Sequence, residues 1–201
     1  QNYTRNRANS FVSKGTLKIC ALKGENGKWT SARLNSRWKK AFTYGYVEFR
    51  AKVADAEGSW PALWLLPDTA EYGQWPRSGE IDVMEHAKTT WQDKTYGTVH
   101  CSAGYGGNPV KSEYTVVKNI EKNWHTYGVL WTEDAITWYC DAKPFCEYKN
   151  PHSEGDSRRE WPFDKDFYII MNVAMGGSLG GTIAKDVDSC RMEVDYVRWY
   201  Q

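Results

Sequence analysis

Three carboxylates stand within six residues of this sequence, at Glu80, Asp82 and Glu85, separated by apolar residues. Successive side chains of a β-strand alternate between its two faces, so Glu80 and Asp82 share one face. Glu85 has the wrong parity for that face, and a β-bulge of one extra residue around 83–84 would return it there. Because close carboxylates repel, the pKa of at least one is raised, and two acids with different pKa values are what cleavage of a glycosidic bond requires. These residues are therefore the predicted catalytic acids; the alternative is a solvated charged face of an edge strand.

The aromatic residues are mainly those with a polar edge. The chain has 11 Trp and 13 Tyr but 6 Phe. Trp and Tyr combine a flat apolar face with a hydrogen-bonding group, which suits pyranose rings. All-β proteins are also rich in aromatics, so plain packing explains the composition equally well.

Five cysteines are present, at Cys20, Cys101, Cys140, Cys146 and Cys190. An odd number leaves at least one unpaired within the chain. The most plausible local disulfide joins Cys140 to Cys146 across a predicted turn, if their Cα atoms approach within about 7 Å. No C-x-x-C spacing occurs, which argues against a zinc site.

The overall composition excludes several classes of function. The net charge is +1 and no basic run occurs, so nothing favours nucleic-acid binding. No apolar run approaches the ~20 residues that a membrane-spanning helix needs. No signal peptide is visible. The length fits one domain over residues 1–201.

Short strand-like segments separated by Gly, Asn, Asp and Pro recur throughout the chain, and none shows sustained helical periodicity. Residues 45–53 alternate most clearly, with apolar side chains at every second position. Many short strands predict an all-β fold, a β-jelly-roll sandwich whose bent sheet leaves a concave groove for a linear polymer. The predicted strands are 16–22, 45–53, 62–66, 79–86, 95–101, 125–131, 136–140, 167–173 and 193–200.

Residues 75–86 resemble the active-site signature of glycoside hydrolase family 16, and within it the laminarinases, which are endo-1,3-β-glucanases. The E-x-D-x-x-E spacing is the bulged form of the motif, whereas the bacterial lichenases of the family have the shorter E-x-D-x-E. Other segments resemble the family in the same order: 58–67, 97–100, 172–177 and 195–201. The resemblance implies a concanavalin-like jelly roll.

It also implies retaining hydrolysis by double displacement. Glu80 would be the nucleophile, and Glu85 the general acid and then the general base. Asp82 would orient Glu80 and share its charge, or be a purely structural salt-bridge acid. His100, on a neighbouring strand, would reach Asp82 or a sugar hydroxyl, or else be a structural histidine.

The resemblance suggests several substrate-binding residues around these acids. Trp60, Trp64 and Trp75 are the predicted stacking platforms, although Trp64 lies in an apolar run that suits the core equally well. Arg77 would bind sugar hydroxyls or steady the acids, or be an exposed loop cation. Asn35 would line the groove.

Family members carry a further segment before the position at which this chain starts, so the resemblance implies that an early strand is lacking. That segment holds ligands of a structural calcium ion, and Asp195 matches the carboxylate that remains. Since Ca²⁺ takes about 6–8 oxygen ligands, its binding here is in question. No cofactor is required for the reaction. The chain is expected to be a monomer; the alternative is that another segment completes its sheet.

The chain is thus predicted to be a secreted enzyme that hydrolyses internal β-1,3-glucosidic bonds in laminarin-type glucans and retains the anomeric configuration. One alternative is a β-1,3-1,4-glucanase or another activity of the family, such as that of the agarases, because loops rather than the fold decide linkage. Another is a non-catalytic β-glucan-binding module, which would typically have lost one or both catalytic glutamates. The partner in every case is a β-glucan or a similar polysaccharide.

Overall fold

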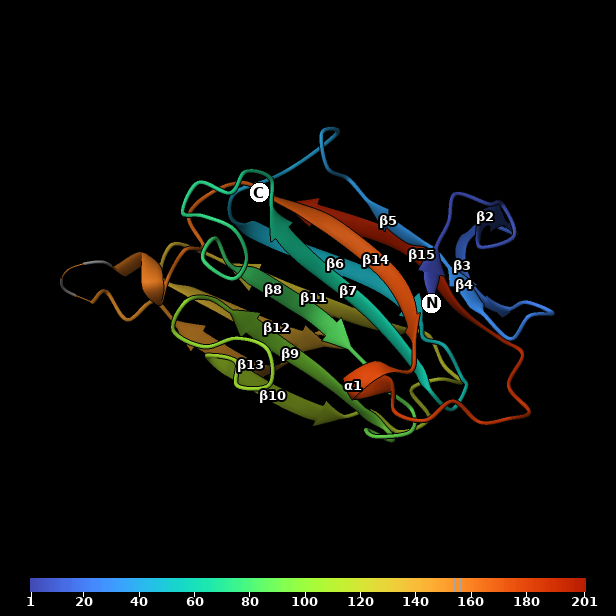
Figure 1. The fold of residues 1–201 in the computed structure, drawn as a ribbon. Coiled ribbons are helices and arrows are strands. Elements are labelled where there is room, and N and C mark those ends of the chain that lie inside the picture. The colour runs from blue at the N-terminus through green and yellow to red at the C-terminus, as the bar shows by residue number, and fades with distance from the viewer. Residues whose placement is uncertain (154, 156) are drawn as a thin grey trace.

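The structure, a computed structural model, describes residues 1–153, 155 and 157–201. Two stacked β-sheets dominate it (Figure 1). The elements in chain order are β1 (Asn2–Tyr3), β2 (Ser10–Ser13), β3 (Thr16–Lys23), β4 (Trp29–Ser31), β5 (Arg33–Asn35), β6 (Gly45–Lys52), β7 (Ser59–Pro67), β8 (Glu80–Glu85), β9 (Lys94–His100), β10 (Lys111–Val116), β11 (His125–Trp131), β12 (Ala135–Cys140), β13 (Lys143–Lys149), the 3-10 helix η1 (Ser157–Arg159), β14 (Phe167–Met175), the short helix α1 (Gly177–Gly180) and β15 (Ser189–Tyr200).

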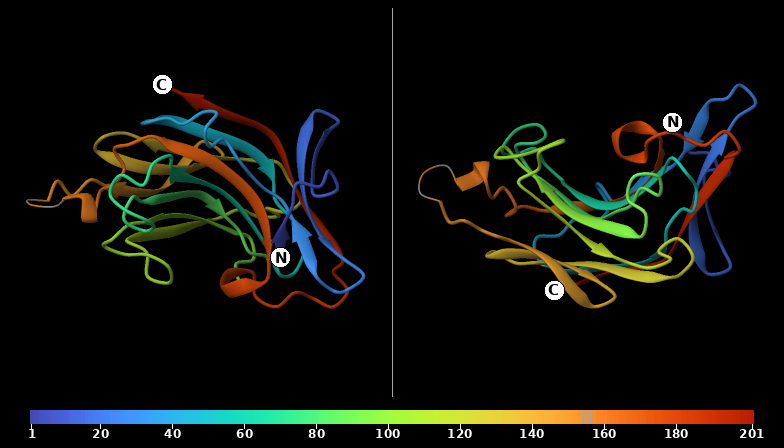
Figure 2. Two further views of the ribbon diagram at one scale, coloured as in Figure 1. Left: turned by 45° about the horizontal axis from the view of Figure 1, so that its top comes forward. Right: turned by 90° about the horizontal axis from the view of Figure 1, so that it is seen from below.

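The outer sheet has nine strands in the order β1-β4-β3-β15-β6-β11-β12-β13, with β2 paired to β3. The inner sheet has six strands in the order β10-β9-β8-β7-β14-β5, which places β8 near its centre. All strand pairs are antiparallel except β1 with β4. Figure 2 shows the two sheets as layers, with the inner sheet bent and α1 beside its end. The predicted jelly-roll sandwich is confirmed.

Alternating apolar residues form the core between the sheets. On β6, Val47, Phe49 and Ala51 are buried, while Glu48 and Arg50 between them face outward. Strands β7, β8 and β9 of the inner sheet contribute apolar side chains to the same core from the other side. Each inner strand therefore has its other face free to line a cleft.

All nine predicted strands are present, with ends shifted by a few residues. The strands that the sequence did not predict are β1, β2, β4, β5, β10 and β13. No helix among the described residues is long and apolar enough to cross a membrane.

The predicted Cys140–Cys146 disulfide is wrong, because all five cysteines are free and buried. Strands β12 and β13 do pair as a hairpin, but Cys140 lies opposite Lys143, and Cys146 lies opposite Trp138. The two thiols are thus out of register along the hairpin, and neither is the cross-strand neighbour of the other.

Candidate active site

The three acids lie on β8, and the predicted bulge is present between the second and the third. Pairing with β7 passes from Trp64 opposite Asp82 to Leu63 opposite Met84, which leaves Val83 as the extra residue. Pairing with β9 shifts in the same interval. Because Val83 and Met84 are both buried in the core, Glu85 returns to the face that carries Glu80 and Asp82.

A tryptophan of the outer sheet holds the backbone at this bulge. Trp138 of β12 is fully buried, and its Nε1 donates a hydrogen bond of 2.7 Å to the carbonyl oxygen of Asp82. Gly97 on β9 leaves room for this indole, because a Cβ at that position would lie 2.3 Å from Trp138 Cδ1. The carbonyl freed by the bulge therefore has a partner, as a buried acceptor requires.

Glu80 accepts a hydrogen bond from Trp75, whose role as a stacking platform stays a prediction. The indole Nε1 donates to Glu80 Oε2 at 2.5 Å. Burial and the charge of Asp82 raise the pKa of Glu80 to about 8, while His100 and the Trp75 hydrogen bond act in the opposite direction. Near neutral pH the three acids of the site therefore hold at least one proton, whereas three isolated carboxyl groups in water would all be ionised.

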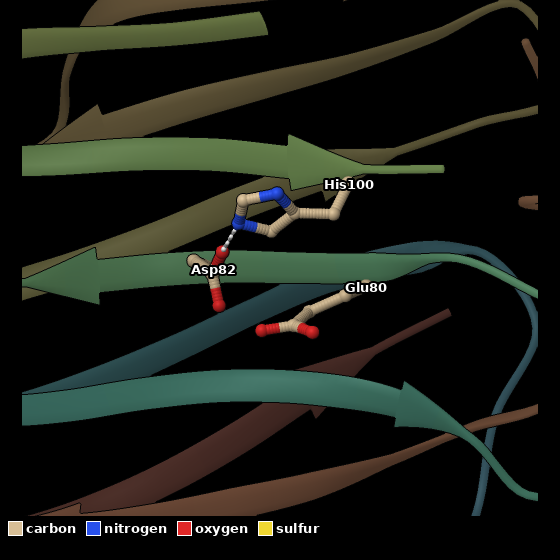
Figure 3. A group of neighbouring side chains, drawn as sticks. All are labelled: Glu80, Asp82 and His100. Carbon is tan, nitrogen blue, oxygen red and sulfur yellow. Dashed lines mark ion pairs between the residues drawn. The ribbon is translucent and has the colours of Figure 1, made fainter. Parts of the chain in front are cut away.

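Asp82 faces His100, which lies opposite Glu80 on β9. The Nε2 of His100 is 3.3 Å from Asp82 Oδ2, and Figure 3 shows the ring reaching toward Asp82 from the neighbouring strand. Asp82 is buried, and this burial, together with the charge of Glu85, raises its pKa well above the usual value. Candidate ligand atoms of Glu80, Asp82 and His100 lie within 4.8 Å of one another. These groups already contact each other and Trp75, and three ligands are fewer than calcium takes.

Glu85 is the more buried of the two glutamates. Trp60 Nε1 donates to its Oε1 at 2.9 Å, and the residue is buried. Burial raises the pKa of Glu85 to about 7; the charge of Glu80 adds to this effect, and the Trp60 hydrogen bond opposes it. A carboxyl with such a pKa keeps its proton in mildly acidic solution, which is the property of a general acid.

Two cavities meet at the acids and together form a cleft across the inner sheet. One, of about 550 Å³, extends over β9 toward β10 and is lined by Trp75, Trp91, Tyr96 and His100. The other, of about 270 Å³, extends over β7 and β14. Trp60, Glu80 and Glu85 line both of them.

Trp64 lies on the cleft side of β7 rather than in the core, and it lines the smaller cavity. Its Nε1 donates to Asn172 Oδ1 at 2.8 Å, and the guanidinium of Arg33 lies 4.4 Å from its ring centre. One face of this indole is therefore already covered, so Trp64 offers less stacking surface to a sugar than Trp60 or Trp75.

Two other predicted substrate-binding residues lie away from the acids. Arg77 is exposed and lines a separate cavity, together with Arg158 and Arg159, so it does not steady the carboxylates. Asn35 is on β5, at the edge of the inner sheet, where its amide oxygen accepts from the backbone N–H of Arg37 at 3.1 Å. It does not line either cavity of the cleft.

The residues around Asp195 do not by themselves fit a calcium ion. Its carboxylate is 2.6 Å from the guanidinium of Arg50, whose positive charge replaces that of a metal. Among the described residues, no cluster of three or more acidic, His or Cys side chains includes Asp195. Calcium at Asp195 stays a prediction.

Comparison with known proteins gives a consistent result. The "Beta-glucanase" of Rhodothermus marinus is 39% identical over 212 residues, covering 100% of this chain and 73% of that protein. The "Glucan endo-1,3-beta-glucosidase A1" of Niallia circulans is 36% identical over 223 residues, covering 100% of this chain and 32% of that protein. Among solved structures, the laminarinase from Rhodothermus marinus superimposes with a TM-score of 0.92 at 37% identity, covering 99% of this chain and 83% of that one.

The bulged E-x-D-x-x-E strand at the centre of a concave sheet agrees with these similarities. The sequence profile of glycosyl hydrolases family 16 matches residues 1–198. This chain belongs to glycosyl hydrolases family 16.

Proposed function

We propose that this chain hydrolyses internal β-1,3-glucosidic bonds of laminarin-type glucans and retains the anomeric configuration. One observation carries the proposal: Glu80 and Glu85 line the same cleft, and each accepts a hydrogen bond from a different tryptophan. Two carboxyl groups on one cleft, in different surroundings, are the equipment for double displacement.

In the first step, the Glu80 carboxylate attacks the anomeric carbon while the Glu85 carboxyl gives its proton to the departing glycosidic oxygen. A covalent glycosyl-enzyme forms, and the shortened glucan leaves. In the second step, Glu85, now ionised, takes a proton from water, and this water releases the sugar from Glu80. The raised pKa of Glu85 supports its role as the acid of the first step.

Asp82 supports the ionised form of Glu80 by holding a proton itself. Its pKa is raised well above the usual value, so the three neighbouring acids do not all ionise together. When Asp82 is protonated, its charge no longer opposes that of Glu80, and the Trp75 N–H and His100 favour the Glu80 carboxylate. Hydrolysis then proceeds from the form in which Glu80 is ionised and Glu85 keeps its proton, a minor form because the pKa of Glu80 (about 8) lies above that of Glu85 (about 7).

The open cleft favours a polymer bound along its length. Aromatic side chains continue from the acids across β9 to β10: the ring centres of Trp91 and Tyr96 lie 4.0 Å apart, and those of Tyr96 and Tyr114 lie 5.3 Å apart. Flat apolar rings with polar edges suit successive sugars. We therefore favour cleavage within chains over removal of terminal sugars.

Release of reducing ends from laminarin, lichenan and agarose tests the activity, and NMR of the first product tests the configuration. We expect release from laminarin with the β-anomer formed first. No release from laminarin refutes the proposal, and faster release from lichenan or agarose assigns one of the alternative activities. Binding of laminarin without any cleavage by the unaltered protein would instead assign a glucan-recognition module.

We also propose that the protein acts outside the cell and as a monomer. A polymeric glucan is too large to reach an enzyme inside, which supports the extracellular location. Activity found in the culture medium of the source cells, and a mass of one chain in size-exclusion chromatography with light scattering, are the expected results.

A further inference from the structure

A buried histidine follows the catalytic motif directly and takes no part in the proposed chemistry. His86 is 0% exposed. Its Nδ1 lies 2.7 Å from the carbonyl oxygen of Lys94, and its Nε2 lies 3.2 Å from Oε1 of Glu121. Glu121 belongs to the segment between β10 and β11 and is itself buried.

Both ring nitrogens of His86 face oxygen atoms. A carbonyl oxygen only accepts, so Nδ1 carries a hydrogen and donates it to Lys94. Nε2 of the same ring is within hydrogen-bond distance of the Glu121 carboxyl, so the two buried side chains form a hydrogen-bonded pair. The hydrogen bond from His86 lowers the pKa of Glu121, in agreement with this pairing.

The pair sits at the point where β8 resumes its pairing after the bulge. Glu85 is opposite Ala62 of β7 and Tyr96 of β9, and the next residue, His86, donates its backbone N–H to the carbonyl of Pro61 at 3.2 Å. His86 therefore ties β8 to β7 through its backbone, and to β9 and the Glu121 segment through its ring. Since the bulge itself lacks regular pairing, these contacts fix the position of the Glu85 backbone along the strand and its rotation about the strand axis.

We infer that the buried His86–Glu121 pair is a positioning device for Glu85 in its role as general acid. It touches neither the substrate nor the reacting atoms. It acts by holding the backbone of β8 so that the Glu85 carboxyl meets both Trp60 and the glycosidic oxygen. The inference rests on the proposed hydrolysis.

Substrates whose leaving groups differ in their need for a proton separate this role from general stabilisation of the fold. Departure of a sugar hydroxyl from laminarin requires the Glu85 proton, whereas departure of dinitrophenolate from an aryl β-laminaribioside does not. In Glu121→Gln and in His86→Gln, we expect kcat/KM on laminarin to fall about 10- to 100-fold, the range for a displaced catalytic group. We expect kcat/KM on the aryl glycoside to fall less than about threefold.

The ratio of the two values is measured on the same sample, so any unfolded fraction cancels, and either variant suffices if the other folds poorly. Glu193→Gln is the matched control. It makes the same change in a part-buried ion pair, with Lys18 at 3.4 Å on the outer sheet. We expect it to leave the ratio unchanged.

An equal fall on both substrates, or no fall on either, overturns the inference, as does a change of the ratio in Glu193→Gln. If the unaltered protein cleaves neither substrate, the proposed function is refuted and the inference with it. If the unaltered protein is active and the ratio stays constant in His86→Gln and Glu121→Gln, the inference alone is refuted.

Discussion

Replacement of Trp75 by Phe isolates the hydrogen bond that the indole gives to Glu80, the proposed nucleophile. Trp75 Nε1 lies 2.5 Å from Glu80 Oε2, and Phe keeps an aromatic ring without the N–H. A hydrogen bond to a charged group stabilises it by about 1.5–3 kcal/mol. Because Trp75 is 51% exposed, water replaces part of the lost donor, so we take the lower end of that range. About 1.4 kcal/mol corresponds to about tenfold in the ratio of ionised to protonated Glu80.

The assay is kcat/KM on laminarin as a function of pH. Loss of the donor raises the pKa of Glu80, so a smaller fraction of the protein has Glu80 ionised, and kcat/KM of Trp75→Phe on the acidic limb of the profile is lower by about tenfold. We expect little change in KM, because Phe keeps an aromatic ring at the position proposed to stack on the sugar. Trp38→Phe is the control, since Trp38 is 86% exposed and its indole N–H has no hydrogen-bond partner among the described residues.

Two results would refute this reasoning. If the acidic limb of the kcat/KM profile is unchanged and KM is higher, Trp75 serves only as a stacking surface for the sugar. A fall of kcat/KM of the same size on that limb in Trp38→Phe would mean that the effect does not arise from the hydrogen bond to Glu80.

Three further substitutions test the strand and its surroundings. Glu80→Gln abolishes hydrolysis but stabilises the fold. The pKa of Glu80 is about 8 in the folded protein, against the usual 4.5. The Glu80 carboxyl therefore favours folding below pH 4.5 and loses this contribution as the pH rises through about 8. Thermal melting near the higher pH should show Glu80→Gln more stable by at least about 1 kcal/mol, with no difference well below the lower one; equal curves throughout contradict this. Trp138→Phe leaves the Asp82 carbonyl without its hydrogen-bond donor. Urea unfolding should therefore show a free energy of unfolding lower by about 1–3 kcal/mol, and laminarin assays should show a lower kcat. Unchanged stability and kcat would refute the role given to Trp138. Gly97→Ala forces a Cβ against the same indole, and the midpoint of urea unfolding should fall by the equivalent of about 1–3 kcal/mol; an unchanged midpoint would mean that the indole moves aside freely.

The long strands of the sandwich could be predicted because one face of each is apolar and the other is not. Strands 45–52 and 125–131 show this pattern and were predicted almost to their ends. The strands that were missed are short or lie near sheet edges, where few side chains are buried and the alternation is weak. Strand β13 also contains Pro144, which argues against a strand in general but is tolerated at the edge position that β13 occupies.

The catalytic face could be predicted because parity along one strand is a local property. The position of Glu85 relative to Asp82 required a bulge, and the bulge is present. The groups that hold this strand could not be predicted in the same way: Trp138 is 56 residues from Asp82, and Glu121 is 35 residues from His86. Such contacts depend on how the two sheets stack, which no local pattern encodes.

The reactivity of the five free cysteines can report local or global unfolding of the protein. Four lie in the outer sheet, and Cys101 directly follows β9 of the inner sheet. Each is buried, and burial raises the pKa of every thiol, most strongly at Cys140 and Cys190. A maleimide reacts with the thiolate and needs access to it, so labelling of the folded protein requires a local or global unfolding event. Mass spectrometry of labelled peptides would therefore rank the strands by the ease with which each one detaches, without any engineered probe.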